Sequence, residues 1–251
     1  MGSRGVSVSR AMPAGESEFT IRERRESTEE STEARDITIR DVARLREAMG
    51  QTGLEAGDPD ATPRNKVYVN SSKSFNINSY LLSDGRTIHS DSSDWDKLGY
   101  TKLDVERAIR QIDSGMKGMS ETIKAYRYVD GDALGKMLGN DRINSVTISR
   151  LINEVSSNPE SLRNLSTALL ETDYTHKAYT STTYVDRHGS YDTRPVKLET
   201  IIRQGTNAIV TTNDREHEIL VGRGQKYNFT GGVRVDTDRF GNKQLVIQVI
   251  L

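Results

Sequence analysis

The stretch Glu216-His217-Glu218-Ile219-Leu220-Val221 places two carboxylates two residues apart, directly before an apolar run. The apolar run indicates a buried strand, and successive side chains of an extended strand point to opposite faces. Residues i and i+2 therefore share a face, so we expect Glu216 and Glu218 to point into one cleft. One carboxylate facing a reacting sugar carbon, with a second beside it to take a proton, is a workable pair for chemistry at a glycosidic bond.

Composition and charge exclude several classes of protein. The 251-residue chain carries 35 basic and 36 acidic residues, so no overall field favours nucleic acid or an anionic membrane as a partner. It has no cysteine, which removes disulfides, thiol nucleophiles and cysteine-bound zinc, and its four histidines lack metal-ligand spacing. We expect no metal site, no signal peptide and no membrane anchor, because the apolar stretches are too short.

The apolar residues are unevenly distributed along the chain. Residues 1–65 are poor in aromatics and rich in Arg, Glu, Ser and Gly, so they bury too little apolar surface to offset the entropy of ordering. We expect a largely disordered arm with one short amphipathic helix at 38–49, where Thr38 and Asp41 form a capping pair. Residues 66–251 cluster their apolar residues and form the predicted folded domain.

Within residues 66–251, helical patterns come first and strands follow. Asp84-Gly85 between apolar flanks is predicted as a hairpin turn. Apolar residues at helical spacing predict helices at 101–112, 133–138, 147–156 and 159–171, with a strand at 123–129 between the first two. Further strands are predicted at 179–185, 196–202, 207–211, 217–221, 226–235 and 243–251. This order favours an α+β fold with a mostly antiparallel mixed sheet.

Three spaced motifs make the chain resemble the Arg–Ser–Glu class of ADP-ribosyltransferases, which holds arginine-modifying bacterial toxins and related phage enzymes. Arg127 lies in a predicted strand between two tyrosines. Ser181 lies in a Tyr-x-Ser-Thr-Thr run that is similar to the Gly-Phe-x-Ser-Thr-Ser stretch of the family. Glu216 and Glu218 then open a later strand. The chain departs from the family pattern at Ala178 and at the last Thr of that run, and its segment before Glu216 is short and lacks an aromatic residue.

The resemblance implies an ADP-ribosyltransferase-like fold, in which N-terminal helices pack on the sheet around an NAD cleft. It implies transfer of ADP-ribose from NAD to arginine side chains of a target protein, with release of nicotinamide through an oxocarbenium-like transition state. NAD is then a substrate, and no metal is needed. Because the Glu-x-Glu form goes with arginine targets in the family, Glu216 favours arginine as the acceptor.

The resemblance also implies a role for each site residue. Glu218 is expected to stabilise the positive charge on the ribose and to hold a ribose hydroxyl of NAD. Glu216 is expected to orient the attacking guanidinium and take its proton. Ser181 is expected to hydrogen-bond Glu218 and fix its side chain. Arg127 is expected to hold the dinucleotide phosphates with its planar fork of donors. Tyr191 is the candidate for stacking on the nicotinamide ring, although a structural loop tyrosine fits the same aromatic-x-x-Arg pattern.

Two other functions stay open at this point. One is an NAD glycohydrolase of the same fold, with water as the acceptor. The other is an inactive virion-associated or structural binding module, against which the intact Arg127, Ser181 and Glu218 argue. The expected partners are NAD and an unidentified protein that bears the arginine, and we expect a monomer. The sequence leaves open whether the protein is a delivered effector, packaged in a phage particle or cytosolic.

Overall fold

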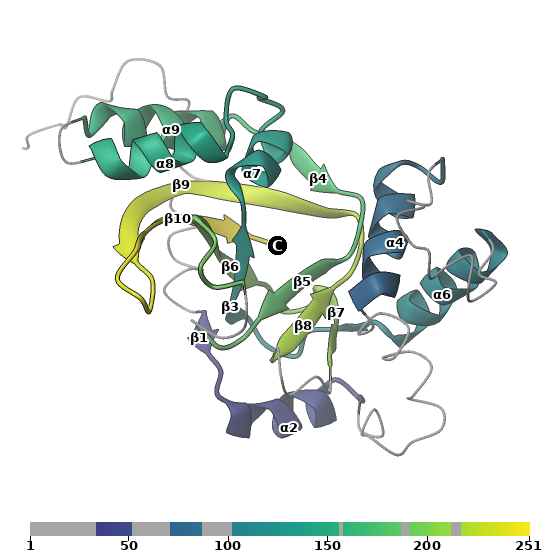
Figure 1. The fold of residues 1–251 in the computed structure, drawn as a ribbon. Helices are drawn as coiled ribbons and strands as arrows, with labels where there is room; N and C mark the ends of the chain where they lie inside the picture. Colours follow the sequence, from purple (N-terminus) through teal and green to yellow (C-terminus); the bar gives the residue numbers. More distant parts are fainter. Residues whose placement is uncertain (1–33, 52–70, 87–101, 156–157, 187–190, 212–216) are drawn as a thin grey trace, which may run out of the picture.

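A computed structural model describes residues 34–51, 71–86, 102–155, 158–186, 191–211 and 217–251. Within these residues the chain forms one ten-stranded sheet with helices at its sides (Figure 1). The strand order is β2-β7-β8-β5-β3-β6-β10-β9-β4, with β1 paired to β3. The pairs β1–β3 and β6–β10 are parallel and the other described pairs are antiparallel. The predicted α+β class with a mostly antiparallel mixed sheet is confirmed.

The helices and strands follow the predicted order closely. The helices are α2 (Ile39–Ala48), α4 (Ser71–Leu82), α6 (Lys102–Gly115), α7 (Gly131–Met137), α8 (Ser145–Glu154) and α9 (Glu160–Leu170). The strands are β1 (Arg35–Asp36), β2 (Lys117–Gly118), β3 (Ile123–Val129), β4 (Tyr174–His176), β5 (Thr180–Thr183), β6 (Val196–Ile202), β7 (Asn207–Val210), β8 (Glu218–Val221), β9 (Gln225–Thr237) and β10 (Lys243–Ile250). Sequence patterns did not predict the short strands β1, β2 and β4, because two or three residues carry no readable period.

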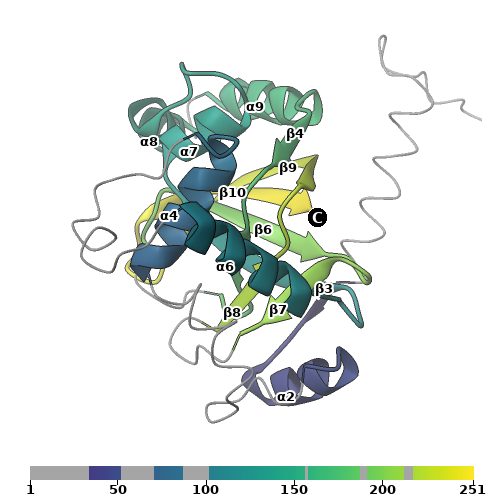
Figure 2. The ribbon, with the colours of Figure 1, turned by 90° about the vertical axis from the view of Figure 1, so that its right-hand side faces the viewer.

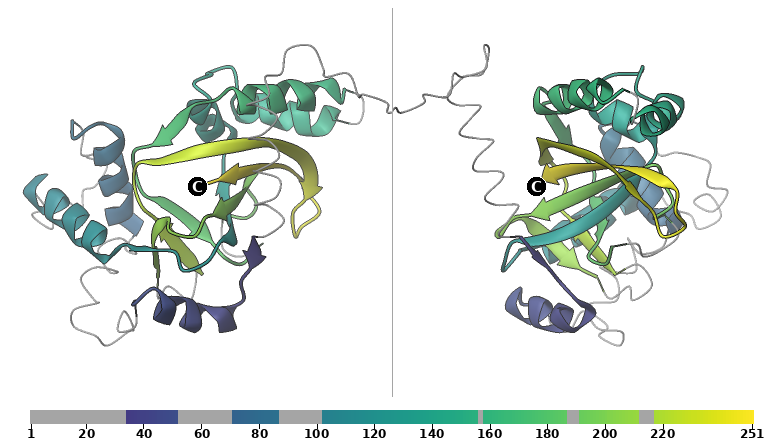
Figure 3. Two further views of the ribbon diagram at one scale, coloured as in Figure 1. Left: turned by 180° about the vertical axis from the view of Figure 1, so that it is seen from behind. Right: turned by 90° about the vertical axis from the view of Figure 1, so that its left-hand side faces the viewer.

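Two groups of helices cover different parts of the sheet. Helices α7, α8 and α9 lie together beside β9 and β10, and α4 and α6 lie beside β5, β7 and β8 (Figure 2 and Figure 3). The residues buried between these two helices and the sheet are Ile77, Tyr80, Val105, Ala108, Ile109, Ile112, Tyr179, Ile209 and Leu220. The face of β8 that carries Leu220 is therefore the face that α4 and α6 cover. None of the described helices is long and apolar enough to cross a membrane.

The segment 34–51 packs into the main core of the molecule. Ile37, Val42, Leu45 and Met49 are buried there together with residues of the sheet. The helix predicted at 38–49 is confirmed as α2, which begins after Thr38 with the predicted capping pair. The domain boundary at residue 65 stays a prediction, and the rest of the expected disordered arm lies outside the described residues.

The turn at Asp84-Gly85 ends a helix instead of joining two strands. Both residues have positive φ, 53° and 77°, and Gly85 N donates to Tyr80 O at 2.8 Å, as at the C-terminus of many helices. The predicted hairpin is therefore wrong. Its apolar flank forms α4, because a short apolar run does not by itself distinguish a helix from a strand.

Candidate active site

A buried carboxylate stands at the first position of β8. Glu218 is 3% exposed, and Ser181 Oγ on the neighbouring strand β5 donates a hydrogen bond to Glu218 Oε1 at 2.6 Å. In the antiparallel register Ser181 is opposite Leu220, so Ser181 and Glu218 share the face that α4 and α6 cover. The hydrogen bond that we expected between Ser181 and Glu218 is present. A short bond from a hydroxyl to a carboxylate fixes the carboxylate strongly.

The backbone turns sharply directly before Glu218. His217 has φ of 49°, in the left-handed region that residues other than glycine rarely adopt. The His217 ring is buried, with Nδ1 3.1 Å from the Tyr184 hydroxyl, and the His217 carbonyl accepts from Tyr184 N at 3.1 Å. These contacts hold a conformation that would otherwise be unfavourable. Sequence reasoning missed His217, since no local pattern marks a histidine for positive φ.

This turn overturns one step of the sequence argument. The predicted strand starts at residue 217, and a shared face for Glu216 and Glu218 by strand alternation requires an extended backbone at His217. The strand begins instead at Glu218, and His217 is left-handed. Strand alternation therefore does not by itself relate the side chain of Glu216 to that of Glu218. Glu216 itself lies outside the described residues, so its role stays a prediction.

Strand β7 holds the backbone of Glu218 from the side opposite β5. Thr211, the residue after β7, donates from its N to Glu218 O at 3.0 Å and from its Oγ1 to the same oxygen at 3.3 Å. Val210 is opposite Ile219 in the antiparallel pair. The carbonyl of Glu218 thus has two donors from Thr211, while the side chain has Ser181.

Arg127 is half-buried in β3 and carries an unsatisfied donor. Its Nη1 is buried and has no hydrogen-bond acceptor among the described residues. An unpaired buried guanidinium nitrogen costs free energy in the ligand-free protein, and an anionic ligand would remove that cost. Arg127 lies near Tyr174 and His176 of β4, whose titrations it affects. Burial, and then the charge of Arg127, lower the pKa of His176 to about 4, so His176 is neutral at pH 7 and adds no second cation.

The register places Arg127 on the other face of the sheet from Glu218. Tyr126 of β3 is opposite Thr183 of β5, and Thr183 is opposite Glu218, so Tyr126 shares the Glu218 face and Arg127 points away from it. A single residue pair joins β3 to β5 in the described sheet, so the two strands diverge on either side of it. The described contacts bring Ser181 and Glu218 together and place Arg127 beside β4.

Tyr191 lies in the turn before β6. Its side chain is exposed, and the Arg194 guanidinium lies 4.5 Å from its ring centroid. Arg194 Nη1 also donates to Tyr128 O at 3.2 Å, so the pair is tied to β3. The aromatic-x-x-Arg pattern of the sequence thus forms a cation–π contact. The proposed stacking of Tyr191 on nicotinamide stays a prediction.

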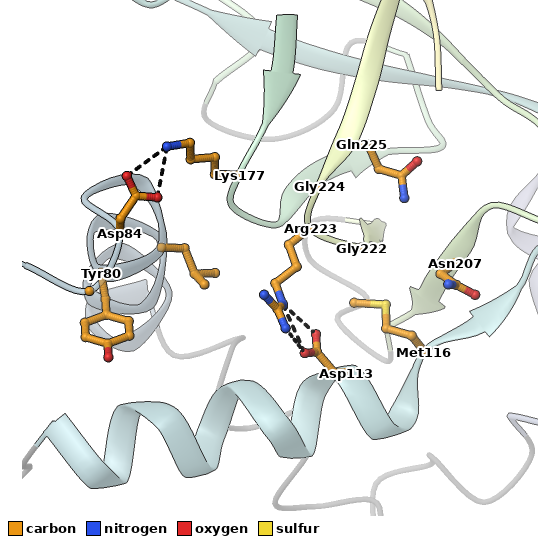
Figure 4. A pocket seen from close by; sticks show the side chains of 12 residues that line it. Tyr80, Asp84, Asp113, Met116, Lys177, Asn207, Gly222, Arg223, Gly224 and Gln225 are labelled. Carbon is orange, nitrogen blue, oxygen red and sulfur yellow. Dashed lines mark hydrogen bonds and ion pairs between the residues drawn. The ribbon is translucent and has the colours of Figure 1, made fainter.

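A separate cavity of about 710 Å³ opens at the other end of β8 (Figure 4). Its walls come from α4, α6 and the turn around Arg223, which follows β8. Two ion pairs lie in it, Lys177 with Asp84 at 2.9 Å and Arg223 with Asp113 at 2.8 Å. The charged residues that line it are therefore paired with one another. Because Gly222, the lining residue nearest to Glu218 in sequence, is four residues or about 13 Å further along the chain at 3.3 Å per residue, we do not assign this cavity to the reaction.

The described residues contain no group of three or more His, Asp or Glu side chains that could hold a metal ion.

A model of the ADP-ribosyltransferase exoenzyme family matches residues 65–251. The chain therefore belongs to this family, and the resemblance inferred from the Arg, Ser and Glu motifs is confirmed.

Solved structures with the same fold include three ADP-ribosylating or C3-type proteins. C3stau2 from S. aureus, solved with NAD, is 19% identical with a TM-score of 0.59, over 87% of this chain and 98% of that chain. BECa, an ADP-ribosylating toxin of a binary enterotoxin of C. perfringens solved with NADH, is 21% identical with a TM-score of 0.60, over 84% of this chain and 48% of that chain. The Clostridium limosum C3 exoenzyme is 18% identical with a TM-score of 0.56, over 88% of this chain and 98% of that chain.

At these identities the likeness shows the fold alone, and it confirms the predicted ADP-ribosyltransferase-like fold. The chain spans about half the length of BECa and nearly all of the two C3 proteins. No curated protein sequence matches this chain significantly.

Proposed function

We propose that this protein transfers ADP-ribose from NAD to arginine side chains of a target protein and releases nicotinamide. The observation that carries the proposal is the hydrogen bond of 2.6 Å from Ser181 Oγ to Glu218 Oε1, made where Glu218 is 3% exposed. Membership of the ADP-ribosyltransferase exoenzyme family supplies the class of reaction. The acceptor residue and the roles of the individual side chains are the finer part of the proposal.

The carboxylate of Glu218 acts on the sugar. When the bond between the ribose and nicotinamide breaks, nicotinamide leaves with the bonding electrons and positive charge develops on the ribose. A carboxylate fixed in advance and shielded from water stabilises that charge more than a mobile, hydrated one does. Ser181 keeps the carboxylate in place, so that little reorganisation is needed when the charge appears.

Arg127 binds the phosphates of NAD at the point where β3 and β5 diverge, and from there the dinucleotide extends between the two strands to Glu218 on the other face of the sheet. Its buried, unpaired Nη1 suits a phosphate oxygen, and the neutral state of His176 leaves the positive charge of Arg127 without a neighbouring competitor. The solved structures of C3stau2 with NAD and of BECa with NADH support a dinucleotide as the ligand of this fold. Tyr191 is the candidate for the nicotinamide ring, because its exposed face can stack on an aromatic ligand.

Glu216 makes the acceptor reactive. A guanidinium is fully protonated at neutral pH and is a poor nucleophile until a base takes its proton. A carboxylate two residues before Glu218 is near enough in sequence to serve as that base. The guanidinium nitrogen then forms a bond to the ribose carbon as the proton passes to Glu216, and arginine carries the ADP-ribose.

The test is incubation with NAD and an arginine-rich acceptor protein, followed by mass spectrometry that localises ADP-ribose on the acceptor. We expect modification of arginine by the wild type and none by Glu218→Ala. Glu216→Gln is expected to lose arginine modification but to keep nicotinamide release. Free ADP-ribose without any modified protein would identify a glycohydrolase instead. Identical results for wild type and Glu218→Ala would favour the binding module.

A further inference from the structure

The outer edge of β7 is covered by two side chains of the segment 34–51. Strand β2 pairs with β7 only at Ala208 and Asn207, so among the described residues no strand neighbours the end of β7 that leads to Thr211 on this side. Helix α2 lies against β7 there (Figure 1). The side chains of Gln51 and Arg46 bond to the backbone of this edge.

Gln51 takes the place of a residue in a neighbouring strand. Its Nε2 donates to Ala208 O at 2.9 Å, and its Oε1 accepts from Val210 N at 3.1 Å. One amide that bridges the carbonyl of residue i and the N–H of residue i+2 reproduces the bonding of a single residue in a parallel ladder. Gln51 is 3% exposed and Ala208 and Val210 are fully buried, so a substitution that keeps the volume of the Gln51 side chain but removes its amide would leave these backbone groups unsatisfied.

Arg46 continues this cover toward Glu218. Its Nε donates to Val210 O at 3.1 Å, and its Nη2 donates to Thr211 O. Hydrogen bonds from a charged donor to a carbonyl are stronger than those between neutral groups. Arg46 therefore fixes the two residues at which β7 ends.

The end of α2 brings Gln51 to this edge. Gly50 has φ of 64°, Gly50 N donates to Glu47 O at 3.0 Å, and Gln51 N donates to Arg46 O at 2.8 Å. These two bonds form a Schellman motif, in which glycine permits the left-handed residue that reverses the chain. The motif places Gln51 and Arg46 on the same side of β7.

The contacts then lead from α2 to the carboxylate. Arg46 and Gln51 hold Val210 and Thr211, and Thr211 holds the carbonyl of Glu218 through its N and its Oγ1. A catalytic group must be held within about 0.5 Å of its productive position by the residues around it. A shift of Thr211 would therefore move the first residue of β8.

We infer that Arg46 and Gln51 are positioning residues, which hold the end of β7 so that Glu218 stays in place for the reaction. The segment that supplies them, 34–51, precedes the residues 65–251 that the family model matches. The kinetic part of this inference rests on the proposed function, and the structural part does not.

Hydrogen exchange of the full chain tests the structural part. In Gln51→Leu and Arg46→Met we expect the amides of Val210 and Thr211 to exchange about fivefold faster or more, as the loss of roughly 1 kcal/mol of hydrogen bonding predicts. The amides of β6 and β10 keep their wild-type rates. Unchanged exchange at Val210 and Thr211, or an equal rise throughout the sheet, would overturn the inference.

Steady-state kinetics of nicotinamide release test the kinetic part. Arg46→Met is expected to lower kcat about tenfold or more with little change in KM for NAD, because misplaced catalytic groups cost rate and not ground-state binding. Arg46→Lys keeps a charged donor and recovers part of kcat. The matched control is Arg44→Met, which removes an exposed arginine of the same helix that pairs with Asp41 and Glu121 at 3.7 Å.

Equal kcat values for Arg46→Met and Arg44→Met would overturn the kinetic assignment. Failure of the proposed function is distinguishable from this outcome. If the wild type releases no nicotinamide, the proposed function fails, and hydrogen exchange at Val210 and Thr211 still decides whether Arg46 and Gln51 fix the end of β7.

Discussion

The hydroxyl of Ser181 and the carboxylate of Glu218 form the smallest unit of the proposed site. The two residues are 37 positions apart in sequence and meet because β5 and β8 are adjacent and antiparallel. Burial makes the hydrogen bond between them matter, since a carboxylate that lost it would have little water to replace it.

Ser181→Ala tests this unit. A hydrogen bond to a charged group contributes about 1.5–3 kcal/mol, so we expect kcat for nicotinamide release to fall roughly 10- to 100-fold. KM for NAD should change less, because the bond positions Glu218 and does not contact NAD. Thr183→Val is the control on the same strand, since the Thr183 hydroxyl bonds locally to Val185 O at 3.3 Å. The same fall in kcat for both variants would argue against a specific role of Ser181.

His176 predicts a dependence of stability on pH. Its pKa is about 4 in the folded protein and about 6.5 in the unfolded chain, so the unfolded chain binds the proton first as the pH falls. The contribution of neutral His176 to the free energy of unfolding is intact above about pH 6.5. It is lost as the pH falls toward 4, and about 2 kcal/mol of it is lost at about pH 5. His176→Phe should lack this loss. Urea unfolding at several pH values measures the free energy of unfolding of the wild type and of His176→Phe. If this free energy depends on pH in the same way in both proteins, the assignment to His176 is contradicted.

Single residues were predictable from sequence where they carry their own chemical signal. Ser181 and Glu218 were placed correctly relative to each other because a strand period and a family motif agree. His217 was not, because its positive φ depends on the contact with Tyr184, 33 residues away in sequence. The expected shared face of Glu216 and Glu218 stays a prediction, because the strand alternation on which it was based does not extend through His217 and Glu216 lies outside the described residues.

At the scale of elements, the start of β8 is set by the left-handed residue in front of it. The turn at His217 ends the extended backbone, and Thr211 and Ser181 fix Glu218 from the two neighbouring strands. The position of the Glu218 carboxylate thus depends on the three strands β5, β7 and β8. Helix α2 also affects it, through its contacts with β7.

Two substitutions of His217 distinguish the effect of backbone strain from the effect of losing the imidazole contact. His217→Gly and His217→Val both remove the imidazole contact with Tyr184, but only valine, branched at Cβ, is strained at φ of 49°. We expect the valine variant to unfold with a free energy about 1–2 kcal/mol lower than that of the glycine variant. Denaturant unfolding of the two variants measures the difference. Equal stabilities would show that the turn relaxes and is not fixed by its neighbours.

Elements with a long, clear period could be predicted from sequence. The buried residues Val105, Ala108, Ile109 and Ile112 gave α6, and strand β3 was placed at 123–129. Asp84-Gly85 was assigned to a hairpin because turn chemistry is shared by hairpins and helix ends. The side-chain cover of β7 by Arg46 and Gln51 could not be predicted, because it is a contact between segments more than 150 residues apart.

At the scale of the whole molecule, the order of helices and strands led to the fold class, and three motifs led to the family. The order of strands in the sheet could not be predicted from sequence, since neighbours such as β6 and β10 are far apart along the chain. The face of the sheet on which Arg127 lies could not be predicted either, because it depends on the single residue pair that joins β3 to β5.

Binding of NAD should stabilise the whole protein. A ligand that binds only the folded state adds about 2.7 kcal/mol at 100 times its Kd, so NAD is expected to raise Tm. Arg127→Met should lose most of this rise, while its Tm without NAD stays at or above that of the wild type, because an unpaired buried donor has been removed. Thermal unfolding with and without NAD measures both effects. A full NAD-induced rise in Arg127→Met would rule out Arg127 as a phosphate ligand.

The rate of nicotinamide release by Glu218→Gln, compared with the wild type under saturating NAD, tests the central claim most directly. Glutamine keeps the size and hydrogen-bonding capacity of the side chain and removes its charge. If the charge of Glu218 stabilises the sugar cation, kcat falls by about 100-fold or more while the NAD-induced rise in Tm is kept. A Glu218→Gln protein that releases nicotinamide as fast as the wild type would contradict the account.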